Sequence, residues 1–258
     1  MNINKNKQSG FTLVEIAIVL VVIGLLLGGI LKGQQLINSA RVRNMADQNS
    51  GVQAAYFGFI DRFRQIPGDM QPTDACAAIG TAVDTNCGGT PTIGGDRNGR
   101  IDQWEEAGAV WAHLSAAGFL NGSFAGDTAA EANYIGGVLT GDVPPNAFQQ
   151  PILLGYTDDY DAVGGSTVRL SFAFGSGVQP SIFRELDVKL DDGAAATGVM
   201  RSTVDTAVNG ETGDNFANAI IWDGSGGSGP DCINNEGTAA SSYNVDSDNE
   251  SCNALYLY

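Results

Sequence analysis

The strongest constraint in the sequence is an apolar run of 21 residues, 11–31, in which Glu15 is the only ionisable side chain. As a helix that rises about 1.5 Å per residue, this run spans roughly 30 Å, the thickness of a bilayer's hydrocarbon core. Lys5 and Lys7 precede the run, and no acidic residue does. Because positive charge stays on the cytoplasmic side, we expect a membrane-spanning helix whose C-terminal side is exported.

The start of this run differs from that of an ordinary secretory signal, which is cut after its apolar stretch. Here a short basic leader, residues 1–10, ends in Gly10 before the apolar stretch begins. Cleavage between Gly10 and Phe11 would therefore keep the apolar helix in the mature protein.

The residues around this junction carry a family resemblance. The sequence KQSG followed by FTLVEIAIVLVVIGLL resembles the signal of type IV pilins and type II secretion pseudopilins. The resemblance implies that a prepilin peptidase cuts after Gly10 and N-methylates the new first residue, Phe11. Glu15 matches the acidic residue that the family carries at the fifth mature position. The resemblance is close over the N-terminal segment and extends to the rest of the chain only in general plan.

The presence of Glu15 in this apolar run needs a physical explanation, because an ionised carboxylate inside hydrocarbon costs at least about 2.5 kcal/mol. In a filament, Glu15 of one subunit would neutralise the α-amino group of Phe11 in its neighbour. A buried charge of this kind fixes the register of packed helices, which gives Glu15 an assembly role. The alternative is a carboxylate that reaches the edge of the bilayer, which its place near the end of the run permits.

Beyond residue 31 the pattern becomes amphipathic. Apolar side chains recur at helical spacing, at Met45, Val52, Tyr56, Phe59 and Phe63. Charged residues lie mostly off this stripe, and Pro67 followed by Gly68 ends it. The sequence predicts one helix over residues 11–66. Its first part, residues 11–31, would lie in the membrane or filament core, and its second half would pack under a globular head.

The head, residues 67–258, has short candidate strands separated by turn residues. Val168, Leu170, Phe172 and Phe174 alternate with Arg169, Ser171 and Ala173, which predicts a strand with one buried face and one wet face that carries the second set. The apolar runs 151–156, 216–222 and 254–258 are further candidates. The stretch PSIFRELDVKLDDG fits a helix from Pro180 and also fits a strand, and its start and stop signals favour the helix.

These elements give an α+β fold class: a long N-terminal helix packed on a head with an antiparallel β-sheet, the lollipop plan of pilins.

The four cysteines fall into two local pairs, with separations of 11 residues for Cys76 and Cys87 and 20 for Cys232 and Cys252. Four cysteines allow three pairings, and local closure favours these two. Disulfides would place the head in an oxidising compartment, and the alternative is four reduced, buried thiols. In pilin-like proteins, a C-terminal disulfide loop commonly forms an exposed edge of the filament.

The stretch GGDRNGRIDQWEE resembles a calcium loop that lacks its first acidic ligand, because Gly94 stands at that position. Oxygen donors at alternate positions suit Ca²⁺, with Asp96, Asn98, Asp102 and Glu105 as candidate ligands. The alternative is an ordinary turn before a helix, with Asp102 as the cap and Glu105 at the third helical position.

Two other acidic stretches, YTDDYD and NVDSDNE, are expected to be solvated loops, with metal binding as the alternative. His113, the only histidine, is expected to be a packed or capped side chain. No motif pairs a nucleophile with a base, so we expect no enzyme. The net charge of −16 disfavours nucleic acid as a partner.

The resemblance implies a structural subunit of a type IV pilus or pilus-like filament. The alternative is a minor pilin or pseudopilin of a type II secretion or DNA-uptake system, with a ligand-binding or subunit-binding head. The expected partners are other pilin subunits, the prepilin peptidase and the inner-membrane assembly machinery. The protein would be a single-pass inner-membrane protein with a periplasmic head before assembly, and part of a surface pilus or periplasmic pseudopilus afterwards. No cofactor is required, and calcium is the only one that the sequence suggests.

Overall fold

The computed structural model describes residues 13–126, 134, 139, 141–175, 177–203, 232–235, 237–250 and 252–258. The chain divides into two compact units, residues 1–40 and 41–258. The helix α1 (Leu13–Phe63) is continuous over 51 residues. The predicted long helix is therefore confirmed within the described residues. It ends slightly before the expected position, because Arg64 adopts a positive φ of 56°.

In the first unit, the described residues of α1 keep their apolar side chains in solvent. Exposed fractions run from 46% at Ile23 to 92% at Leu13. This stretch is apolar and long enough to cross a membrane, and none of its most apolar window is buried against the described residues. The exposed apolar residues are Leu13, Val14, Ile16, Ile18, Val19, Leu20, Val21, Val22, Ile23, Leu25, Leu26, Leu27, Ile30, Leu31, Leu36 and Ile37.

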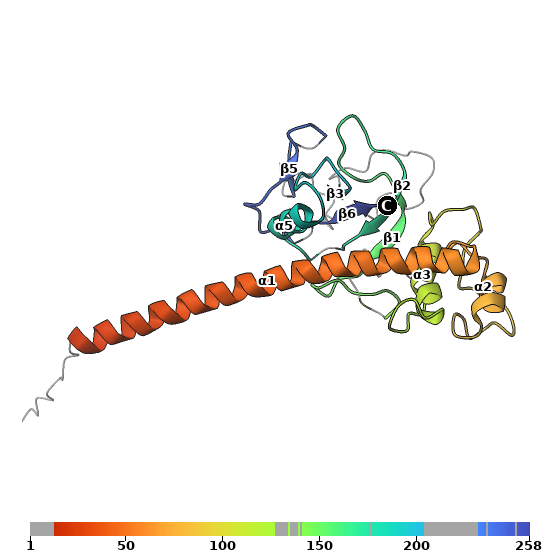
Figure 1. Ribbon diagram of the computed structural model, residues 1–258, viewed down its shortest axis with the longest axis horizontal. Helices are drawn as coiled ribbons and strands as arrows, with labels where there is room; N and C mark the ends of the chain where they lie inside the picture. Colours follow the sequence, from red (N-terminus) through yellow and green to blue (C-terminus); the bar gives the residue numbers. More distant parts are fainter. Residues whose placement is uncertain are drawn as a thin grey trace, which may run out of the picture. The chain divides into compact units, whose positions relative to one another are not determined.

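In the second unit, α1 buries one stripe of side chains against the head. The predicted charged residues off this stripe, from Arg41 to Arg64, are exposed. Figure 1 shows this part of α1 running along the sheet. The spacing of the stripe follows the 3.6-residue period of a helix with one buried face. The buried residues are Val42, Met45, Asn49, Val52, Ala55, Tyr56 and Phe59.

The main sheet has four antiparallel strands in the order β1-β2-β6-β3. They are β1 (Leu153–Thr157), β2 (Arg169–Ala173), β6 (Ala254–Leu257) and β3 (Met200–Ser202). The register places Leu153 opposite Ala173 and Phe172 opposite Tyr256. A separate two-stranded sheet joins β4 (Ile233–Asn234) to β5 (Ser242–Tyr243). Three of the predicted strands are confirmed, and the predicted strand at 216–222 lies outside the described residues.

The prediction that β2 has one wet face is wrong. Ser171 and Ala173, expected on the wet face, are only 2% and 1% exposed. β2 lies inside the sheet, between β1 and β6, and the head covers both of its faces. Small side chains on the second face let neighbouring segments approach closely, and periodicity alone does not reveal that cover.

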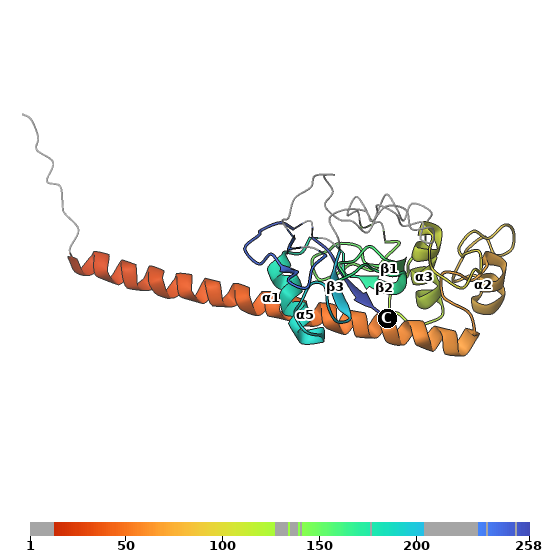
Figure 2. The ribbon, with the colours of Figure 1, turned by 90° about the horizontal axis from the view of Figure 1, so that it is seen from above.

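Three helices complete the head: α2 (Pro72–Ile79), α3 (Trp104–Ala116) and α5 (Pro180–Leu190). The helical interpretation of PSIFRELDVKLDDG is confirmed by α5. Both views place α5 near one end of the sheet, and α2 and α3 near the C-terminal end of α1 (Figures 1 and 2). Buried side chains from α1, α3, α5 and the sheet form one hydrophobic core.

Hydrogen bonds also join α1 to the rest of the head. The hydroxyl of Tyr258, just after β6, donates a hydrogen bond to Asn49 Oδ1 at 2.8 Å. The Gln48 amide donates to the Pro145 carbonyl at 2.8 Å. Asn49 is 2% exposed, so the hydrogen bond from Tyr258 satisfies a buried polar group on this face of α1.

Both disulfides favoured by local closure are present, Cys76–Cys87 and Cys232–Cys252. The second closes the loop that carries β4 and β5. Asp161 holds the same loop from inside, because its carboxylate accepts hydrogen bonds from Gly237 N and the Ser241 hydroxyl.

The stretch YTDDYD is therefore not a solvated loop, and that prediction is wrong: its aspartates, Asp158, Asp159 and Asp161, are buried. The aspartates and glutamate of NVDSDNE, Asp246, Asp248 and Glu250, are exposed as expected.

Candidate functional site

The first candidate site is the N-terminal part of α1. Glu15 lies in the first turn of this helix, where the helix dipole favours negative charge. It is surrounded in sequence by exposed apolar side chains, among them Leu13, Val14 and Ile16. A surface this apolar is stable only against lipid or against another apolar surface. Gly10 and Phe11, the predicted cleavage and methylation residues, lie outside the described residues.

The second candidate site is an acidic cluster in the head, between the end of α1 and the start of α3. One carboxylate oxygen from each of Asp69, Asp96 and Glu106 lies within 4.8 Å of the others. Asp69 and Glu106 are 3% and 1% exposed, and Asp96 is exposed. The cluster therefore joins the segment after α1 to the loop before α3 and to the first turn of α3.

Backbone hydrogen bonds hold the loop of Asp96 against the segment of Asp69. Gly95 N donates to the Met70 carbonyl at 2.8 Å, and Arg97 N donates to the Asp69 carbonyl at 3.0 Å. The approach is close enough that a Cβ on Gly95 would lie 2.3 Å from Glu106 Oε1. Only glycine fits there without displacing that carboxylate, which explains the glycine-rich start of the loop.

Both carboxylate oxygens of Glu106 accept hydrogen bonds from the backbone of the loop before α3. Its Oε1 accepts a hydrogen bond from Asp96 N at 3.1 Å, and its Oε2 accepts one from Asp102 N at 2.9 Å. Gln103 is the N-cap of α3, and Glu106 stands at its third helical position. The expected cap formed by Asp102 and Glu105 is therefore wrong by one residue. The reason is that Gln103 still has extended dihedrals, so α3 begins at Trp104.

The calcium ligands expected from the sequence do not all meet. Asp96 belongs to the cluster, but Asn98 and Asp102 hydrogen-bond each other, with Asn98 Nδ2 3.1 Å from Asp102 Oδ1. Glu105 is exposed on α3. Sequence reasoning missed Asp69 and Glu106. Glu106 is adjacent to the predicted ligand, whereas Asp69 lies 27 residues before Asp96 and no spacing rule connects the two.

The electrostatics of the cluster follow from its burial. Burial raises the pKa of Glu106 to about 7, and the charges of Asp69 and Asp102 add to this effect. Burial also raises the pKa of Asp69, against hydrogen bonds from Gly99 and neighbouring backbone groups that lower it. The ionised forms of Glu106 and Asp69 are disfavoured, because the fold brings several carboxyl groups together away from water.

His113, on the face of α3 beside this cluster, is buried as expected for a structural histidine. Its Nδ1 accepts a hydrogen bond from Gly68 N at 2.9 Å, so the proton of the neutral ring sits on Nε2. Its ring stacks parallel to Phe59 of α1. Burial lowers the pKa of His113 to about 4, so the ring is neutral at physiological pH.

Comparison with known proteins bears on the first site. Residues 5–31 match the family model described as the prokaryotic N-terminal methylation motif. The chain carries a prepilin signal, the one shared by type IV pilins and pseudopilins. No curated protein and no solved structure matches the chain.

The prepilin signal supports a type IV pilin-like or pseudopilin protein, a structural class rather than an enzymatic one. It implies processing by a prepilin peptidase and assembly with other pilin subunits. The apolar α1 fits a protein anchored in the membrane before assembly. The matched range contains Gly10, Phe11 and Glu15, so the prepilin signal and the exposed apolar helix coincide.

Proposed function

We propose that the protein is a structural subunit of a type IV pilus or pilus-like filament, cut after Gly10, methylated on Phe11 and polymerised through α1. The observation that carries this proposal is the stretch of α1 from Leu13 to Ile37, whose apolar side chains are left exposed by the part of the chain that the structure describes. A membrane anchor alone would account for the first part of this stretch. The prepilin signal over the same residues favours transfer from lipid into a helical polymer.

The energetics of that transfer differ from those of folding in water. Lipid tails are as apolar as leucine, so the gain comes from close packing of helices rather than from escape from water. Contacts between uniformly apolar helices do not favour one axial position over another. A specific interaction is therefore needed to set the axial register of the helices. Glu15 would supply it by pairing with the α-amino group of Phe11 on a neighbouring subunit, because a carboxylate in an apolar core is far more costly unpaired than paired with a cation.

N-terminal mass spectrometry of the protein from its native host tests the processing step. We expect a chain that begins at Phe11 and carries one added methyl group. A surface or secreted form that begins downstream of residue 31 would overturn the proposal, because it would lack the helix that polymerises.

Substitution of Glu15 separates processing from assembly. We expect Glu15→Ala and Glu15→Gln to be cleaved normally and to be absent from sheared filaments. Glu15→Asp, which keeps the charge on a shorter side chain, should retain part of the assembly. A normal filament yield from Glu15→Gln would contradict the pairing of charges. The stoichiometry of the same preparations identifies the subunit as major or minor: a dominant band means a major subunit, and a trace band means a minor pilin or pseudopilin.

A further inference from the structure

We propose that Asp69, Asp96 and Glu106 form a calcium site that fastens the segment after α1 to the loop before α3. This site lies in the head and does not depend on the proposed filament function. It also differs from the ligand set suggested by the sequence, because Asp69 and Glu106 take the places expected for Asp102 and Glu105.

The first support is the geometry of the carboxylates. Calcium binds oxygen at about 2.3–2.6 Å, so ligands on opposite sides of one ion lie roughly 5 Å apart. The three carboxylate oxygens of the cluster lie within 4.8 Å of one another, which is the separation that one such ion requires. Carboxylate oxygens are the preferred ligands of this hard cation.

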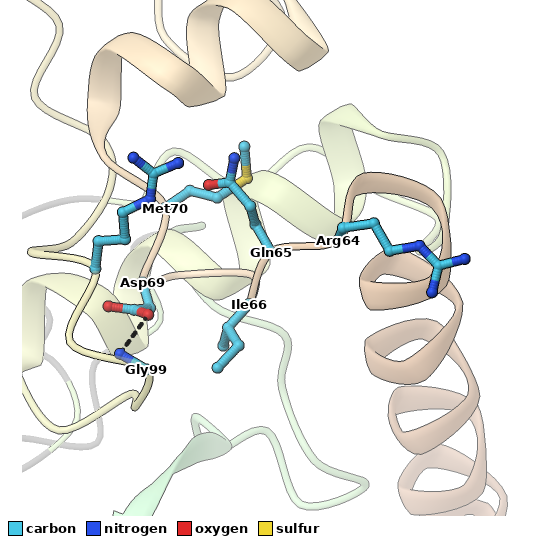
Figure 3. Close-up of a pocket in the computed structure, with 7 residues that line it drawn as sticks. Arg64, Gln65, Ile66, Asp69, Met70 and Gly99 are labelled. Carbon is cyan, nitrogen blue, oxygen red and sulfur yellow. Dashed lines mark hydrogen bonds between the residues drawn. The ribbon is translucent and has the colours of Figure 1, made fainter.

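The second support is a buried oxygen that lacks a hydrogen bond. Asp69 is 97% buried, and its Oδ2 accepts a hydrogen bond from Gly99 N at 2.9 Å (Figure 3). Among the described residues, no donor reaches its Oδ1. A buried carboxylate oxygen without a partner is costly, and a bound cation is one of the few groups that would satisfy it.

The third support is a cavity that gives an ion access to Asp69. It has a volume of about 260 Å³ and is lined by the segment after α1 together with Arg97 and Gly99. The side-chain oxygen of Gln65, which lines the same cavity, is also buried without a hydrogen bond among the described residues. The guanidinium of Arg97 is held by Asp74 at 2.8 Å, so this cation is already paired outside the cluster.

A second acidic group shows the contrast. Asp187, Asp191 and Asp192 also lie close together, near the end of α5. Asp187 Oδ1 accepts a hydrogen bond from Gly193 N, and Asp192 accepts one from Ala194 N. Asp187 Oδ2 is also buried without a hydrogen bond among the described residues, but the Tyr243 hydroxyl faces this carboxyl and is a donor that the fold itself supplies. For Asp69 Oδ1 no described residue plays that part, and this is the difference between the two groups.

The test uses the full-length protein in detergent, stripped with a chelator and titrated with calcium chloride in a calorimeter. We expect one ion to bind with a dissociation constant in the range of extracellular sites, about 10⁻⁴–10⁻³ M. Calcium at about 10 mM should raise the melting temperature of the head by several degrees, because it binds only the folded state. Magnesium at the same concentration should do less, since it demands shorter bonds and a near-ideal octahedron.

Matched variants locate the ion. Asp69→Asn keeps an oxygen to accept from Gly99 N and removes the charge, so we expect calcium affinity to fall at least about tenfold. Asp96→Asn should also lower the calcium affinity. Because Asp96 is exposed, this variant should fold even if Asp69→Asn does not. Glu105→Gln is the control, because Glu105 lies next to the cluster on α3 but outside it, and its calcium affinity should equal that of the wild type.

Three outcomes would overturn the proposal. They are the absence of any calcium-dependent heat or melting shift in the wild type, equal affinity in the wild type and both aspartate variants, and a loss of affinity in Glu105→Gln alone.

Discussion

The two stretches of α1 have opposite relationships to their surroundings. Residues 13–37 expose apolar side chains over most of the helix surface, whereas residues 42–59 bury one stripe and expose their charges. The second stretch gains its stability inside the chain, since its stripe belongs to the core of the head. Among the described residues of its own unit the first stretch has no such partner, and lipid or other chains would supply one. A helix of uniform secondary structure therefore combines a folding surface with an assembly surface.

The largest expected effect that sharpens this comparison comes from truncating one side chain in each stretch. Phe59→Ala should lower the free energy of unfolding of the head by about 3–5 kcal/mol, because Phe59 is fully buried and stacks near His113 and Phe63. Leu25→Ala, at a position that is 73% exposed, should change it by less than about 0.5 kcal/mol. Urea unfolding of the detergent-purified chain, followed by tryptophan fluorescence, measures both. Similar losses from the two variants would mean that the two stretches do not differ as described.

Removal of a disulfide should have the next largest effect, and it should be confined to the head. Replacing Cys232 and Cys252 by serine opens a loop with a sequence separation of 20, which should destabilise the head by about 3 kcal/mol through the entropy of the unfolded chain. Hydrogen exchange read by mass spectrometry should report faster exchange in β4, β5 and β6 and unchanged exchange in residues 13–40, which contain no cysteine. Faster exchange in that first stretch as well would break the comparison.

The pH dependence of the head gives a smaller effect with a defined sign. The pKa of His113 is lowered to about 4 in the fold from 6.5, so the unfolded state binds more protons between these values. The stability that His113 contributes is present above about pH 6.5 and is lost as the pH falls through 4, a loss on the order of 3 kcal/mol.

His113→Asn, which offers an oxygen to Gly68 N, isolates this contribution and should show a weaker loss of stability in acid. The variant is needed as a reference because Asp187 and Glu106 titrate with the opposite sign. Burial raises the pKa of each to about 7, so their contributions are lost as the pH rises toward that value. Thermal unfolding of both proteins across this pH range gives the comparison, and parallel pH profiles would contradict the role of His113.

The sequence predicts the elements whose signals are local. The stripe from Met45 to Phe59 repeats with the helical period, and Pro180 marks the start of α5, so both helices are readable without tertiary information. The wet face expected for β2 was wrong because the cover over Ser171 and Ala173 comes from segments distant in sequence. Short strands such as β3 and β4 carry too few residues to show a period.

The candidate sites also differ in how far the sequence alone predicts them. Glu15 stands out because its charge interrupts an apolar run, a contrast visible in the sequence alone. The head cluster is readable only in part. Asp96 belongs to a recognisable loop, but Asp69 reaches it through the turn after α1, and the one-residue shift of the cap from Asp102 to Gln103 depends on backbone dihedrals. The burial of Asp161 similarly depends on Gly237 and Ser241, which lie 76 and 80 residues further along the chain.

The double hold on the C-terminal loop has a consequence for engineering. The Cys232–Cys252 bond closes the loop, and Asp161 accepts hydrogen bonds from Gly237 and Ser241, so the tip at residues 245–248 lies beyond both attachments. Val245, Asp246 and Asp248 at this tip face water. Lengthening an already closed loop costs only about 0.6 kcal/mol for each doubling. The tip is therefore a suitable position for inserting a foreign peptide. The disulfide and the Asp161 hydrogen bonds would keep the head folded while the peptide is exposed on its surface.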